Sequence, residues 1–218
     1  MKRILIFRTD RIGDFLICSS IWSSLKRNYK DSQIDIVCSN LNYEYIKSFN
    51  FFNNVFLYPN KLIKKIVFFF SLGKYDKILV LDGKKRSIYI SIFKNSKVKI
   101  LFTPSRIIQK IFKIFFNSIF FINYKKPKID LIKKCLIDLN CDFNEKDLNF
   151  LKFFGNNTHL NYKTPDYNFI VLNLDEKWFF DKYIKTYKNI EPSYEQFTNF
   201  LRDVSQNINV IITNGYVQ

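Results

Sequence analysis

The sequence has no alanine, and its 218 residues include only five glycines, four cysteines and one histidine. With so few glycines it has neither the GxGxxG pattern nor the Walker A pattern that cradle phosphates in many nucleotide-binding proteins. No two cysteines form a CxxC pair, and one histidine cannot complete a zinc site of recognisable spacing. We therefore expect reduced thiols, no metal site and no cofactor.

Long hydrophobic runs are missing as well. The apolar stretch at the N-terminus ends at Arg8 and Asp10, too early for the hydrophobic region of a signal peptide. The most apolar segments, 66–72 and 107–122, are respectively too short and too often interrupted by polar residues to form transmembrane helices. These features predict a cytoplasmic protein.

Positive charge is what the sequence has in excess, with 35 Lys and Arg against 19 Asp and Glu and a net charge of +16. Such a balance favours anionic partners, so a non-catalytic basic module that binds anionic membrane or nucleic acid is one open interpretation. The aromatic residues, however, lie in apolar runs rather than interleaved with arginine, which does not favour base stacking. We expect no nucleic-acid partner.

Short apolar, β-branched runs alternate with helix-like segments, a rhythm typical of parallel βαβ units. It predicts an α/β fold in which the first part of the chain forms a doubly wound, Rossmann-like parallel sheet. The expected strands are 3–8, 34–38, 55–58, 77–81 and 98–102, and the expected helices are 15–29, 61–72, 87–93, 105–122 and 129–139.

The expected helix over 105–122 carries a narrow polar stripe, because Arg106, Lys110, Lys113 and Asn117 are spaced at i, i+4, i+7 and i+11. Two interpretations stay open. The apolar arc of this helix packs against the sheet, or the helix lies on an anionic membrane surface with its three cations facing the lipid.

The segment 141–165 is polar and rich in Asn and Asp, as in an interdomain linker. A strand over 169–174, a helix over 193–207 and a strand over 210–213 follow it. We predict an N-terminal Rossmann-like domain with its linker over 1–165 and the start of a second Rossmann-like domain over 166–218. One βαβ unit buries too little surface to stand alone, so we expect a fragment or a truncated product.

Ligands of open parallel sheets bind beyond the carboxyl ends of the strands. Gly13 and Asp14 follow the first expected strand, and Asp14 is either a catalytic base or a cap of the next helix. Lys84, Lys85 and Arg86 follow the fourth strand, where they suit phosphate or carboxylate groups of a ligand or form a solvated charge run.

The order of these motifs resembles family 9 of the glycosyltransferases, the heptosyltransferase family of the two-domain GT-B type. The match spans nearly the whole chain. It rests on Arg8, Gly13 and Asp14 at the start, on the segment from Tyr75 through Asp82-Gly83 to Arg86-Ser87, on Lys177-Trp178, and on the final turn Thr213-Asn214-Gly215.

The resemblance implies inverting transfer of a heptose or related sugar from a nucleotide sugar, typically ADP-linked, to a lipid-linked acceptor of the lipopolysaccharide core. Asp14 would be the general base. Lys177 and Trp178 would bind the nucleotide sugar, with Lys177 neutralising the departing diphosphate. The acceptor would be held by Arg8, Gly13, Lys84, Lys85 and Arg86.

A lipid-linked acceptor would place the protein at the inner face of the cytoplasmic membrane, where the excess of Lys and Arg favours a peripheral contact with anionic lipid. Two other interpretations remain: the non-catalytic basic module, and a doubly wound domain for another nucleotide ligand, which lacks a supporting glycine pattern.

Overall fold

The computed structural model of this chain describes residues 2–123, 125, 127–148, 166–174 and 193–214. The chain separates into two compact units, Met1–Asn157 and Thr158–Gln218, and each is described by itself. A six-stranded sheet forms the centre of the first unit, and a two-stranded sheet lies in the second.

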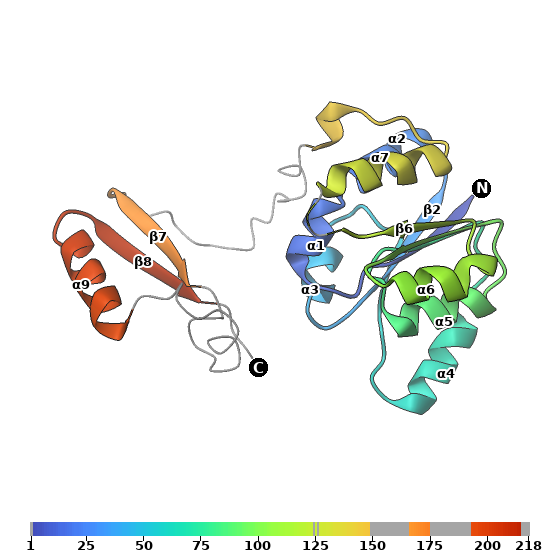
Figure 1. The fold of residues 1–218 in the computed structure, drawn as a ribbon, viewed down its shortest axis with the longest axis horizontal. Coiled ribbons are helices and arrows are strands. Elements are labelled where there is room, and N and C mark those ends of the chain that lie inside the picture. Colours follow the sequence, from blue (N-terminus) through green and yellow to red (C-terminus); the bar gives the residue numbers. More distant parts are fainter. Residues whose placement is uncertain (1, 124, 126, 149–165, 175–192, 215–218) are drawn as a thin grey trace. The chain divides into compact units, whose positions relative to one another are not determined.

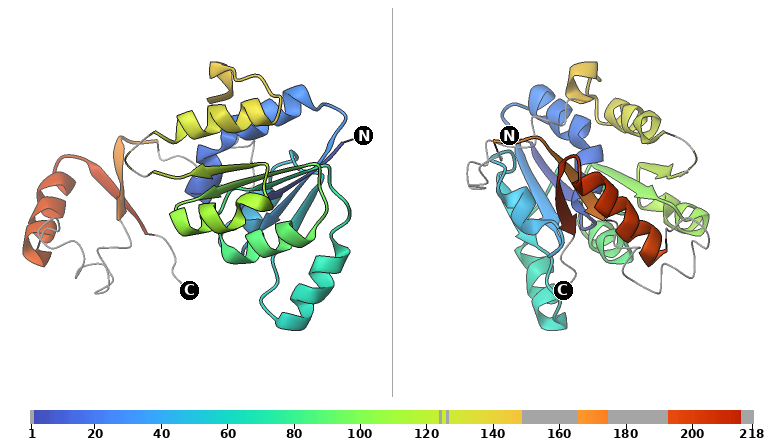
Figure 2. Two further views of the ribbon diagram at one scale, coloured as in Figure 1. Left: turned by 45° about the vertical axis from the view of Figure 1, so that its right-hand side comes forward. Right: turned by 90° about the vertical axis from the view of Figure 1, so that its left-hand side faces the viewer.

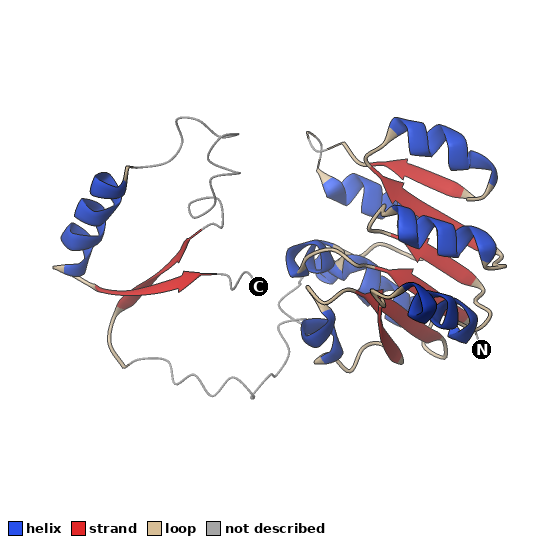
Figure 3. Ribbon diagram, turned by 90° about the horizontal axis from the view of Figure 1, so that it is seen from below, coloured by secondary structure: helices blue, strands red, loops and turns tan. Residues whose placement is uncertain are grey.

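The six-stranded sheet has the strand order β3-β2-β1-β4-β5-β6 (Figure 1). Every neighbouring pair is parallel (Figure 3). The predicted doubly wound α/β sheet is confirmed, in the strand order of dinucleotide-binding folds. Its strands are β1 (Arg3–Phe7), β2 (Gln33–Cys38), β3 (Asn54–Leu57), β4 (Lys77–Val80), β5 (Val98–Thr103) and β6 (Ser118–Phe121).

Helices cover both faces of the sheet, as crossover connections between parallel strands require. In Figure 1 and Figure 2, α2 and α7 lie over one face and α4, α5 and α6 over the other. The helices of this unit are α1 (Ile12–Ile17), α2 (Ser19–Asn28), α3 (Tyr43–Lys47), α4 (Leu62–Ser71), α5 (Lys85–Phe93), α6 (Arg106–Ile111) and α7 (Lys128–Asp138), with 3₁₀ helices at Phe112–Ile114 and Glu145–Leu148.

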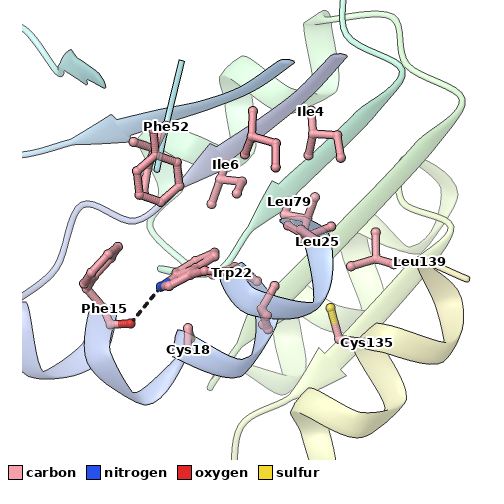
Figure 4. Packing of buried hydrophobic residues seen from close by; sticks show 14 of the residues in the cluster. Ile4, Ile6, Phe15, Cys18, Trp22, Leu25, Phe52, Leu79, Cys135 and Leu139 are labelled. Carbon is pink, nitrogen blue, oxygen red and sulfur yellow. Dashed lines mark hydrogen bonds between the residues drawn. The ribbon is translucent and has the colours of Figure 1, made fainter. Parts of the chain in front are cut away.

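Alternate side chains of β1 enter two separate hydrophobic clusters, because successive strand residues point to opposite faces of a sheet. Ile4 and Ile6 pack in the cluster that contains Trp22 of α2 (Figure 4). Leu5 and Phe7 pack in the other cluster, beneath α4, α5 and α6. All five side chains are fully buried, so β1 lies at the centre of the unit.

The prediction of a single helix over 105–122 is wrong. α6 ends at Ile111, a 3₁₀ turn follows, and the chain then forms β6 beside β5. Asn117, which the helical stripe included, docks on β5 instead. Its N–H donates to the carbonyl of Lys99 (2.9 Å), and its side-chain oxygen accepts the N–H of Lys99 (2.7 Å). The β-branched and aromatic residues of 118–121 suit a strand, and pairing with β5 overrides the helical spacing.

Three further segments differ from expectation. The helix predicted over 15–29 starts earlier and is divided at Cys18 into α1 and α2, and α3 was not predicted. Part of the predicted linker packs on α2, where the buried Asp147 carboxylate accepts hydrogen bonds from Arg27 (2.5 and 2.6 Å) and Ser24 (3.1 Å).

The second unit contains the predicted strand, helix and strand. β7 (Phe169–Leu174) and β8 (Asn209–Asn214) pair in parallel, and α9 (Tyr194–Ser205) connects them. A capping box starts α9: the Gln196 N–H donates to the Ser193 hydroxyl (3.1 Å), and the Ser193 N–H donates to the Gln196 side chain (2.8 Å). Reciprocal bonds of this kind satisfy two N–H groups that a helix start leaves open.

Candidate functional site

A cavity of about 240 Å³ lies at the carboxyl ends of β1 and β4. These two strands are neighbours at the point where the strand order reverses, which is where open α/β sheets bind ligands. The cavity is lined by Arg8, Asp10, Asp14, Ile17, Cys18, Leu81, Asp82, Phe102, Pro104, Ile122, Lys128, Leu131 and Ile132.

Arg8 follows β1 directly and organises the floor of the cavity. Its side chain is nearly fully buried, and its guanidinium donates to the Leu81 carbonyl (2.5 Å) and the Asp14 carbonyl (2.6 Å). Its Nε lies 3.1 Å from an Asp10 carboxylate oxygen. A planar guanidinium with several fixed donors can hold three chain segments at once. Arg8 thus joins the ends of β1 and β4 to α1.

Asp14 is the third residue of α1, and its side chain is 35% exposed at the cavity. One carboxylate oxygen lies 3.5 Å from Nη2 of Arg8 and 3.3 Å from Nζ of Lys128. The cap position of α1, a helix described in full, belongs to Arg11, and no side chain forms the cap hydrogen bond. The Asp14 carboxylate therefore faces two cations and the cavity rather than capping the helix.

Asp10 is a second carboxyl group in the same cavity. Burial raises its pKa to about 6, the nearby charges of Asp14 and Asp82 add to the rise, and Arg8 opposes it. A carboxyl group with a pKa close to neutrality can accept or donate a proton near physiological pH. Sequence reasoning missed Asp10 as a site residue, although it lies in the same short loop as Asp14.

Asp82, after β4, ties the loops of two neighbouring strands together. Its carboxylate accepts hydrogen bonds from the hydroxyls of Thr9 (2.5 Å) and Ser87 (2.7 Å) and from the N–H of Lys84 (3.2 Å). Gly83 makes this turn possible, because its φ is +60° and an added Cβ would lie 2.7 Å from the Phe102 carbonyl oxygen. These contacts fix the shape of the cavity wall.

The three predicted cations after β4 have different surroundings in the structure. Lys84 Nζ donates to the carbonyl of Thr9 (2.7 Å), and Arg86 donates to the same carbonyl (3.3 Å) and to the Thr9 hydroxyl (2.8 Å). The Arg86 guanidinium also lies over the ring of Tyr58. Lys85 is exposed at the start of α5. Two of the three cations are therefore bonded to the loop after β1.

Four other predicted residues, all within the described part of the chain, do not line this cavity. Gly13 is exposed, and an added Cβ there would meet no atom of the described chain within 4 Å. Arg106 lies over the ring of Phe121, while Lys110 and Lys113 are exposed. Lys177 and Trp178, the candidate nucleotide-sugar residues, lie outside the described residues.

Lys128 was also missed by sequence reasoning. It is the first residue of α7, more than a hundred residues after Asp14, and no local sequence pattern indicates that it belongs to the site. Its ammonium reaches Asp14 only because α7 packs back beside α1 and α2. Distant cations of this kind cannot be recognised from spacing along the chain.

The described part of the chain contains no group of three His, Cys, Asp or Glu side chains that could hold a metal ion. None of its helices has the length and apolar character needed to cross a bilayer. The four cysteines are buried, unpaired thiols, and burial raises the pKa of Cys38 to about 12.

No protein-family model and no curated protein matches the chain in sequence. Solved structures do match. E. coli heptosyltransferase WaaC with ADP aligns with 99% of this chain and 67% of its own, at 14% identity and a TM-score of 0.63. The same enzyme with ADP-2-deoxy-2-fluoro heptose aligns with 98% of this chain and 69% of its own, at 13% identity and a TM-score of 0.63.

A glycosyl transferase of family 9 from Veillonella parvula DSM 2008 aligns with the whole of this chain and 71% of its own, at 12% identity and a TM-score of 0.59. The chain therefore spans about two thirds of the length of these structures. What this similarity establishes is the fold: the chain has the α/β architecture of the heptosyltransferase and family 9 glycosyl transferase structures.

Proposed function

We propose that this chain belongs to an inverting glycosyltransferase that moves a heptose or related sugar from an ADP-linked nucleotide sugar to a lipopolysaccharide core-type acceptor. Residues 1–165 form the acceptor side, and residues 166–218 belong to the side that binds the nucleotide sugar. The shared fold supports this assignment, since one matching structure contains ADP and another an ADP-heptose analogue. The observation that carries it is the Asp14 carboxylate, partly exposed in a cavity at the switch point of the sheet.

Asp14 is the general base in this proposal. It takes the proton of the acceptor hydroxyl while the hydroxyl oxygen forms a bond to the anomeric carbon of the donor sugar. The bond from that carbon to the diphosphate breaks, and the nucleoside diphosphate leaves from the opposite face, which inverts the anomeric centre. Arg8 and Lys128, at 3.5 and 3.3 Å, hold the carboxylate and its negative charge in place.

The other predicted residues take supporting roles. Gly13 leaves the start of α1 uncovered for the acceptor, because no side chain stands there. Lys84 and Arg86 position the loop after β1 through Thr9, and the exposed Lys85 meets anionic groups of the acceptor. Lys177 and Trp178 contribute to the nucleotide-sugar site.

An enzyme with a lipid-linked acceptor must reach that acceptor at a membrane surface. We therefore place the enzyme at the inner face of the cytoplasmic membrane, in peripheral contact with anionic lipid. Arg106, Lys110 and Lys113 carry positive charge toward that surface in this proposal, since cations near an anionic leaflet are attracted to it.

The test is the release of nucleoside diphosphate from a panel of nucleotide sugars, measured with the full-length enzyme and a core-type saccharide acceptor. Asp14→Asn removes the base but keeps the size of the side chain, so kcat should fall by about 10²- to 10⁴-fold with little change in KM for the donor. Full activity of this variant would remove Asp14 from the mechanism.

Asp10→Asn is the matched control, because Asp10 lines the same cavity and also contacts Arg8. A loss of turnover that follows Asp10 instead of Asp14 would move the base to Asp10. Absence of turnover with every nucleotide sugar would favour the non-catalytic basic module.

A further inference from the structure

α4 turns its apolar side chains away from the protein. Within this helix, all of which the structure describes, Phe68 is the buried residue. Five other apolar side chains are more than half exposed, where a helix packed on a sheet normally buries them. They are Leu62 (72%), Ile63 (77%), Ile66 (53%), Val67 (63%) and Phe70 (75%), and we call them the α4 apolar face.

The α4 apolar face is continuous. Its members occupy positions i, i+1, i+4, i+5 and i+8, which at 3.6 residues per turn fall within an arc of about 140°. Phe68, which packs in the cluster beneath α4, points out of this arc toward the sheet. In both views of Figure 2, α4 lies at the outer end of its helical layer. The exposed fractions of its five members leave the face accessible to an external partner.

The surroundings of this face are positively charged. Lys61, Lys64, Lys65 and Lys74 lie within or beside the helix, and residues 59–75 contain no acidic side chain. Residues 59–123 as a whole hold 14 Lys and Arg against two Asp, so most of the net charge of the protein lies in this part of the chain. Both of these carboxylates already accept hydrogen bonds within the protein. Asp76 accepts one from the N–H of Arg3, and Asp82 accepts one each from the hydroxyls of Thr9 and Ser87.

α6, which lies beyond α5 in the same helical layer, repeats this pattern (Figure 1). Ile107 and Ile111 of α6 and Ile114 of the 3₁₀ turn are 70%, 59% and 84% exposed. The exposed Lys110 and Lys113 lie between them in sequence. α4 and α6 cover the same face of the sheet (Figure 1), and both carry exposed apolar and exposed lysine side chains.

We propose that α4 lies flat on a phospholipid bilayer that contains anionic lipid. The α4 apolar face enters the boundary between headgroups and acyl chains, and the flanking lysines contact lipid phosphates, as in interfacial amphipathic helices. A ten-residue helix is too short to cross a bilayer, so it rests on the surface. A second copy of this chain is a poorer occupant, because the same lysines would meet each other. This inference deepens the peripheral membrane contact of the proposed function and assigns it to α4. Vesicle binding needs no turnover, so its failure is distinguishable from a failure of sugar transfer.

The experiment measures co-sedimentation of the 218-residue protein with vesicles of phosphatidylcholine, with and without phosphatidylglycerol. We expect binding to the phosphatidylglycerol vesicles and little to the neutral ones, with binding weakened by salt. Ile63→Ser combined with Phe70→Ser should weaken binding at least about tenfold, because it removes two inserted apolar side chains. Unchanged binding of this double variant would overturn the proposal.

The matched control is Leu41→Ser combined with Ile137→Ser, whose side chains are 63% and 70% exposed but lie outside α4 and α6. This pair should bind the vesicles as the unchanged protein does. An equal loss in both double variants would mean that general apolar exposure, and not α4, drives binding, which overturns the assignment.

A second readout reports insertion directly. Phe70→Trp places an indole on the α4 apolar face, and its fluorescence should shift to the blue with phosphatidylglycerol vesicles and not with phosphatidylcholine alone. Absence of vesicle binding together with a dimer that Ile63→Ser and Phe70→Ser dissociate would show that the face joins two copies, and this too would overturn the proposal.

Discussion

The helices on the two faces of the sheet in the first unit differ in how fully their apolar side chains are buried. On one face of the sheet, Phe15 of α1, Trp22 of α2 and Cys135 of α7 are fully buried. On the other face, Ile63 of α4 and Ile114 after α6 are 77% and 84% exposed. Apolar content therefore does not tell which helix covers the core, because the side that a helix turns toward the sheet decides what is buried.

The difference lies in how many side chains each helix turns inward. In α2, Ile21, Trp22 and Leu25 are buried together with three serines, and the buried Ser24 donates a hydrogen bond to Asp147. The described α4 is held to the sheet mainly by Phe68 and the following Leu72. The first layer thus contributes most to the core, while the second leaves an apolar surface outside.

Trp22→Ala should have the largest effect on stability. The indole fills the first core cluster and donates a hydrogen bond to the Phe15 carbonyl (3.1 Å), so its loss leaves a cavity and should cost about 3–5 kcal/mol of unfolding free energy. Urea denaturation followed by circular dichroism measures it. Phe70→Ala is the control from the other layer and should change stability by less than about 0.5 kcal/mol. Equal losses of unfolding free energy in the two variants would contradict the difference in burial between the two layers.

The pH dependence of stability should report the partly buried carboxyl group of Asp10, in the loop between β1 and α1. The pKa of Asp10 is raised from 3.8 to about 6, so the folded state binds this proton more tightly than the unfolded state. The free energy of unfolding should therefore fall as pH rises from about 4 to 6, by up to about 3 kcal/mol from this group.

Asp10→Asn tests this effect, since it removes the titrating carboxyl. The variant should gain stability relative to the unchanged protein as pH rises from 4 to 7.5, measured by urea denaturation at each pH. A difference between the two proteins that does not change with pH would contradict the burial of this carboxyl group.

A smaller effect is expected at the loop that anchors the second layer. Gly83→Ala must keep φ near +60° and bring a Cβ within 2.7 Å of a carbonyl oxygen, which should cost about 1–3 kcal/mol. Gly13→Ala, at the start of α1, meets no atom within 4 Å in the described chain and should cost nothing or stabilise slightly. Thermal unfolding of the two variants compares them, and similar melting temperatures would show that the Gly83 turn is not strained.

Local patterns in the sequence were sufficient for most of the fold. Runs such as 77–80, which is Lys-Ile-Leu-Val, predicted buried parallel strands, because a strand covered on both faces needs continuous apolar residues. The helix predicted over 193–207 is α9, and Ser193 is its N-cap, part of a capping box whose residues lie within four positions. The helix over 105–122 failed because its i, i+4 spacing is local, while the pairing of β6 with β5 is not.

The candidate site, too, was predicted in part from the sequence and decided in part by the tertiary structure. Gly13 and Asp14 after β1 could be singled out because the ends of parallel strands meet at one sheet edge, a rule that needs only the order of elements. That Lys128 reaches Asp14, that Lys84 and Arg86 bond Thr9, and that Asp10 is buried enough for a raised pKa were decided by the tertiary structure. Charge partners and desolvation depend on distances between segments far apart in the chain, and sequence spacing does not contain those distances.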